Sequence, residues 1–86
     1  MKYSIDVPEY SSAEGLKFEW KANFHISIRI DNERTVLIAA NSDGLKSLAR
    51  HLLALAEAPV PKGYHFHLDD SNSLEEGSCE LVIMRE

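Results

Sequence analysis

The feature that most constrains this fold is one amphipathic segment in the middle of the chain. Asn41, Ser42 and Asp43 are residue types that cap the free amide groups of a helix's first turn. Pro59 and Pro61 prevent a helix from continuing, so we expect it to end near residue 58. Apolar residues recur every three or four positions between these limits and predict a stripe that packs on a sheet: Leu45, Leu48, Leu52 and Leu55, widened by Ala49, Leu53 and Ala56.

Alternating apolar and polar residues before this helix predict strands. Leu16, Phe18 and Trp20 alternate with charged residues, and residues 24–30 repeat the pattern with aromatic and isoleucine side chains. Residues 31–33 supply turn chemistry ahead of a second apolar run, so we expect an antiparallel hairpin formed by residues 24–30 and 35–39. The second run leaves no polar face, which predicts a central strand.

Two further strands are predicted after the helix, at residues 64–68 and 79–85, and an additional N-terminal strand is expected at residues 2–7. The order strand-strand-strand-helix-strand-strand predicts an α+β fold, an antiparallel or mixed sheet of about five strands with one helix packed on one face. A single helix covers one sheet face only, so the other face should stay wet or meet a partner. With 86 residues, the chain is expected to form a single domain, 1–86.

Composition narrows the classes of function. The net charge is −5 with nine basic residues, which argues against a nucleic-acid partner, because such binders concentrate Lys and Arg on one face. No apolar run approaches the roughly 18 residues that a membrane-spanning helix needs, and the first residues lack the apolar core of a signal peptide. We therefore expect a cytoplasmic protein with no membrane partner. Cys79 is the only cysteine, so no internal disulfide can form.

Histidines mark one face of the strand at residues 64–68. Its apolar members should face the helix, so the alternate residues His65, His67 and Asp69 should point away from it. This spacing offers three potential metal ligands, but a structural zinc site needs four protein ligands and a catalytic site needs three in tight geometry. His25 approaches the pair only if the strands are neighbours, and His51 lies on the opposite side of the sheet. We assign no metal and no cofactor, and keep a metal-binding protein or small metal-dependent enzyme as an alternative.

No complete catalytic group is visible in the sequence. Ser27, His65 and Asp69 would form a Ser-His-Asp arrangement only if their strands were adjacent, and the chain lacks a nucleophile elbow. Glu75 and Glu76 are adjacent loop residues, which seldom point into one site. The protein is therefore not expected to be an enzyme.

Acidic residues are concentrated after the histidine strand. Twelve residues that contain no Lys or Arg include Asp69, Asp70, Glu75, Glu76 and Glu80. Such a local negative potential attracts a basic partner. A loop kept polar for solubility explains the same composition, and both interpretations stay open.

Three segments carry a resemblance to a known family. They are GLKSLARHLLALA at residues 44–56, HFHLD at residues 65–69, and LEEGS followed by ELVI within residues 74–83. In this order they resemble small bacterial immunity proteins of polymorphic toxin systems, in particular the group called immunity protein family thirty-two. The resemblance covers roughly the C-terminal half. It implies a cytoplasmic protein that neutralises a cognate toxin by direct binding.

The acidic stretch and the resemblance together predict a partner-binding surface. Its candidate residues are His65, His67, Asp69, Asp70, Glu75 and Glu76. The expected partner is a cognate toxin with a basic surface, such as that of a nuclease active site. A homodimeric interaction module, in which the open sheet face pairs with a second copy, is a further alternative.

Overall fold

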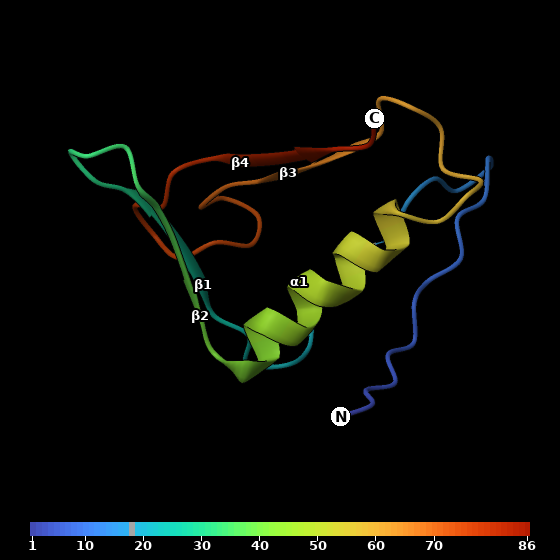
Figure 1. The fold of residues 1–86 in the computed structure, drawn as a ribbon, viewed down its shortest axis with the longest axis horizontal. Coiled ribbons are helices and arrows are strands. Elements are labelled where there is room, and N and C mark those ends of the chain that lie inside the picture. The colour runs from blue at the N-terminus through green and yellow to red at the C-terminus, as the bar shows by residue number, and fades with distance from the viewer. Residues whose placement is uncertain (18) are drawn as a thin grey trace.

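The computed structural model describes residues 1–17 and 19–86, and these residues form one helix and four strands. Strands β1 (Ile26–Ile30) and β2 (Val36–Ala40) precede helix α1 (Ser42–Leu55), and strands β3 (His65–Leu68) and β4 (Leu81–Met84) follow it. In Figure 1 the β1–β2 hairpin, the β3–β4 hairpin and α1 form the three sides of a triangle. The predicted α+β class is confirmed.

The two hairpins do not join into the predicted five-stranded sheet. Among the described residues, β1 pairs only with β2 and β3 only with β4, each pair antiparallel. The second edge of β1 is occupied by the loop that leads into β4. Glu75 donates its backbone N–H to the carbonyl of Ile26, and Cys79 donates to the carbonyl of Ile28, each at 2.8 Å. A loop therefore supplies the hydrogen bonds that another strand would have made.

The strand expected around residues 16–20 is not formed by the residues that the structure describes, and Phe18 lies outside them. The backbone N–H of Glu19 donates to His51 Nε2 at 3.1 Å, and that of Lys21 donates to Ser47 Oγ at 2.9 Å. Helix side chains therefore take hydrogen bonds that a sheet ladder would need. The expected strand at residues 2–7 is also wrong, since this segment has no regular secondary structure.

β2 is an edge strand, although its unbroken apolar sequence predicted a central one. Its register sets Ile38 opposite Ile28 and Val36 opposite Ile30. Ile28 is 1% exposed, whereas Ile38 is 44% exposed. The core therefore covers β1 as far as Ile28 but leaves the outer part of the hairpin in solvent.

α1 begins where the sequence predicted and ends earlier. Asn41 is the N-cap, and its side chain accepts a hydrogen bond from Gly44 N at 2.8 Å. The helix ends at Leu55 with Ala56 as the C-cap, before the expected end near residue 58. Its buried residues are Gly44, Ser47, His51, Ala54 and Leu55.

The predicted leucine stripe is wrong in part. Leu55 is buried and Leu48 packs partly against the core, but Leu45, Leu52 and Leu53 are about half exposed. The helix instead turns small and hydrogen-bonding residues inward, because the backbone of residues 19–21 docks on Ser47 and His51.

The core lies between the helix and the two hairpins. Its buried apolar cluster draws on every side of the triangle and on two connecting loops: Ile26, Ile28, Leu55, Val60, Phe66, Leu68 and Leu74. In the described part of the chain, α1 is too short and too polar to cross a lipid bilayer.

Candidate functional site

The residues predicted to bind a partner gather on the β3–β4 hairpin and on residues 69–80, here called the acidic loop. This loop is folded around Asp69, whose carbonyl accepts hydrogen bonds from the backbone N–H groups of Asn72, Ser73 and Leu74 at 3.3, 3.1 and 2.9 Å. Leu74 is 6% exposed and belongs to the core. The middle of the loop is therefore anchored in the protein interior.

The second half of the acidic loop is fastened to β1. Besides the two backbone bonds to Ile26 and Ile28, Ser78 Oγ accepts the N–H of Ile28 at 3.2 Å. Arg29 Nη1 donates to the carbonyl of Gly77 at 2.7 Å. Gly77 has a φ of +82°, a backbone conformation that residues with a side chain rarely adopt. The glycine therefore lets the loop turn while it stays in contact with β1.

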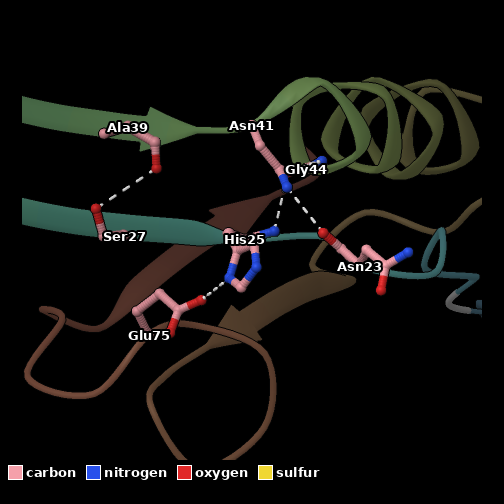
Figure 2. A network of polar contacts seen from close by, with 7 residues as sticks. All are labelled: Asn23, His25, Ser27, Ala39, Asn41, Gly44 and Glu75. Carbon is pink, nitrogen blue, oxygen red and sulfur yellow. Dashed lines mark hydrogen bonds and ion pairs between the residues drawn. The ribbon is translucent and has the colours of Figure 1, made fainter.

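The carboxylates of the loop have different surroundings. The carboxylate of Glu75 contacts His25 Nδ1, as Figure 2 shows. The contact is an ion pair when the imidazole of His25 is protonated. Asp70 Oδ2 accepts the backbone N–H of Gly77 at 3.2 Å, so this carboxylate also helps to close the loop. Glu76 is exposed. Within the acidic loop, Asp70 and Glu76 are the two exposed carboxylates with no cationic partner among the described ion pairs.

The fold brings basic groups to a loop whose sequence contains no Lys or Arg. Arg29 comes from β1 and His25 precedes it, so both lie far from the loop along the chain. Sequence reasoning missed both contacts because they depend on the docking of the loop along β1. The one relevant signal in the sequence is the alternation of polar residues on β1, which indicates a polar face that another segment could contact.

The predicted alternation of β3 is confirmed. Phe66 and Leu68 are buried at 1% and 4% exposure, while His65 and His67 are exposed. His67 Nε2 lies 3.8 Å from Asp69 Oδ2 and 3.6 Å from Glu80 Oε2. Glu80 was counted among the acidic residues but was not named as a site residue. Glu80 lies beside Asp69 and His67 because the antiparallel register sets Leu68 opposite Leu81, and so Asp69 opposite Glu80.

The other histidines take no part in this group. His65 Nδ1 lies 3.3 Å from the carbonyl of Gly63, and His25 meets Glu75 instead of the β3 pair. His51 is 2% exposed and packs edge-on against Trp20, with ring centroids 4.3 Å apart. Burial lowers the pKa of His51, because it disfavours the charged form of the imidazole. The predicted separation of His51 from the histidines of β3 therefore holds.

Among the described residues, the Ser-His-Asp arrangement considered from the sequence does not assemble. Ser27 Oγ lies 3.5 Å from the carbonyl of Ala39, to which it donates within its own hairpin, as Figure 2 shows. His65 belongs to the other sheet and faces the Gly63 carbonyl. Within the described residues, His67, Asp69 and Glu80 form a group of three potential metal ligands, and their ligand atoms all lie within 4.8 Å of one another.

Comparison with known proteins identifies a family. The family named Immunity protein 32 matches residues 35–86, from the residue before β2 to the last residue of the chain. Comparisons with curated proteins and with solved structures found no match. The matched segment includes α1, the β3–β4 hairpin and the whole acidic loop. Because the match covers more than half of the chain, the protein belongs to the Immunity protein 32 family.

Proposed function

We propose that this protein is a bacterial cytoplasmic inhibitor that neutralises a cognate toxin by binding it, without catalysing a reaction. Membership of the Immunity protein 32 family supports a toxin as the partner. Inhibition by binding requires a complementary surface and no catalytic group. The acidic loop is the surface that we assign to this task.

The observation that carries the proposal is that the acidic loop is held in one shape before any partner arrives. Its backbone is tied to Ile26 and Ile28, its Gly77 carbonyl is held by Arg29, and Leu74 anchors it in the core. A loop that is already ordered loses less conformational entropy on binding. The backbone that carries its exposed carboxylates is therefore already in position for binding.

The partner is expected to offer a basic surface. Asp70 and Glu76 supply exposed negative charge, and complementary charge speeds encounter and selects among partners. Glu75 is less available to a partner because its carboxylate is already in contact with His25. We assign His65 and His67 to the rim of the same interface, as hydrogen-bonding groups beside the loop.

The test is to purify the protein with each toxin encoded beside its gene and to measure binding and neutralisation. Glu76→Gln should slow association by up to about five-fold at low salt, the size expected for losing one exposed charge pair. Glu57→Gln is the matched control, because Glu57 is also an exposed glutamate but lies just beyond α1. Equal effects of the two variants, or no binding to any neighbouring toxin, would contradict the proposal.

A second candidate function is self-association through β2. This strand has a free edge, and Val36, Leu37 and Ile38 are 54%, 58% and 44% exposed. Natural edge strands usually carry charges or prolines that block pairing with another chain, and β2 carries neither. Sedimentation of the wild type against Leu37→Lys tests it: a dimer that the lysine dissociates supports this function, and a monomeric wild type at high concentration removes it.

A further inference from the structure

We propose that His67, Asp69 and Glu80 bind a divalent transition-metal ion, with Zn²⁺ as the fitting species. The three side chains lie at one end of the β3–β4 hairpin, on the face turned away from the core. His67 Nε2 is 3.6 Å from Glu80 Oε2 and 3.8 Å from Asp69 Oδ2. Zinc bonds of about 2.1 Å in tetrahedral geometry separate neighbouring ligand atoms by about 3.4 Å. The two distances from His67 are therefore close to coordination spacing, and the ligand atoms of Asp69 and Glu80 lie within 4.8 Å of each other.

The donor set selects the class of ion. Two carboxylates and one neutral imidazole carry a charge of −2, which balances a divalent cation. Imidazole is a good ligand for zinc and other late transition metals, whereas Mg²⁺ and Ca²⁺ prefer oxygen donors alone. Three protein ligands leave the fourth tetrahedral position for water or for a group from a partner.

Hydrogen bonds orient Asp69 for this role. Its Oδ1 accepts the N–H of Ser71 at 2.9 Å, while its Oδ2 faces His67. Asn72 bridges the two residues, because its Nδ2 donates to the carbonyl of His67 at 2.9 Å and its Oδ1 accepts the N–H of Asp69 at 3.0 Å. The Ser71 N–H is the outer partner that fixes the direction of the Asp69 carboxylate, and such partners raise metal affinity. Asn72 fixes the backbone that carries the two ligands.

Glu80 is the least constrained ligand. Its side chain is 72% exposed, so binding must restrict its rotamers at a cost in free energy. Its backbone is nevertheless fixed, because it directly precedes β4 and the register of the hairpin sets it opposite Asp69. A metal ion there would join the first residue of the acidic loop to its last one.

This proposal goes beyond toxin binding, and its test uses the isolated protein. The full chain, freed of metal with a chelator, is titrated with Zn²⁺ by calorimetry in a buffer that does not bind zinc. We expect one saturable site and a higher melting temperature with zinc, since a ligand that binds the folded state stabilises it. Bound Co²⁺ should give the visible absorption of a four-coordinate site.

Matched variants locate the site. His67→Ala and Glu80→Gln should each weaken zinc binding by at least about tenfold, because even the loss of an outer-shell partner costs that much. His65→Ala is the control, since His65 lies two residues away on the same exposed face of β3 but outside the group. Circular dichroism of each variant checks folding, and Glu80→Gln removes a ligand without touching the strand core.

Three results would overturn the metal site: no saturable binding below about millimolar zinc, an equal loss in His65→Ala, or unchanged affinity in His67→Ala and Glu80→Gln. None of these depends on a toxin. Failure of the metal site leaves toxin neutralisation intact, and failure to bind a toxin leaves the zinc titration unchanged.

Discussion

Gly44, in the first turn of α1, packs directly against the carbonyl group of His25, which leads into β1. The approach is so close that a side chain on Gly44 would collide with the carbonyl oxygen of His25. Asn41 holds the same junction from its side chain. Its Oδ1 accepts the N–H of His25 at 3.0 Å and of Gly44 at 2.8 Å, and its Nδ2 donates to the carbonyl of Asn23 at 2.8 Å, as Figure 2 shows. The packing of helix on hairpin therefore depends on two small residues near the N-terminus of α1.

Gly44→Ala should destabilise the protein, although alanine favours a helix interior over glycine by about 1 kcal/mol. A Cβ at this position also lies 3.0 Å from Ile26 Cγ1 and 3.1 Å from Ala40 Cβ, so the helix must shift to admit it. We expect a loss of about 1–3 kcal/mol in the free energy of unfolding, the usual cost of overpacking. Denaturant unfolding measures it, and a stabilised variant would show that the helix does not rest on β1.

Asn41→Ala should cost about 2 kcal/mol of unfolding free energy, at the upper end for an N-cap, because it removes hydrogen bonds to two other segments besides the cap itself. Asn41→Asp is the matched control. It keeps an acceptor for both N–H groups and loses only the donor to Asn23, so it should be the milder change. Equal losses in the two variants would assign the stability to the Asn23 contact alone.

Leu55→Ala and Leu52→Ala should separate the true buried face of α1 from the predicted stripe. Leu55 is 5% exposed and Leu52 is 46% exposed, although both belong to the same apolar periodicity. Removing the buried side chain should cost about 2–5 kcal/mol, whereas the exposed one should cost less than about 1 kcal/mol. Urea unfolding of the pair decides, and similar losses would mean that the helix packs on its leucine stripe.

Local chemistry made much of this fold predictable. The caps at residues 41–43, the turn at residues 31–33 and the alternation in β3 each follow from short-range rules, and these elements appear within a few residues of their expected positions. The resemblance of the C-terminal half to immunity proteins also agrees with the family that matches residues 35–86. Each of these signals depends on residues that are close together along the chain, so a single sequence is enough to predict them.

Docking between segments was not predictable from the same rules. The apolar run of β2 lies at an edge because, among the described residues, no strand pairs with its second side, and the acidic loop rather than a strand takes the other side of β1. Ser47 and His51 are buried on α1 because they accept hydrogen bonds from a distant backbone. In the candidate site, Asp69 and His67 were found from strand spacing, whereas Glu80 required the β3–β4 register. Each miss is a contact between residues far apart in the sequence.

His51 is buried between Trp20 and Phe66 and accepts the N–H of Glu19 through Nε2. This hydrogen bond requires a ring without a proton on Nε2, so the folded state needs the neutral imidazole. Burial also favours the neutral imidazole, because it disfavours the charged form, and it therefore lowers the pKa of His51.

Stability should therefore fall as the pH drops below about 6.5, where an unfolded histidine takes up a proton and the folded His51 does not. The unfolded state then binds more protons than the native state, and the loss grows by up to about 1.4 kcal/mol per pH unit until the pH reaches the lowered pKa. Unfolding free energies at about pH 7.5 and about pH 5.5 should differ more for the wild type than for His51→Gln, which keeps an acceptor but does not titrate. If that variant does not fold, an NMR titration of the wild type replaces it. An imidazole of His51 that protonates at the ordinary pH of a free histidine would refute the prediction.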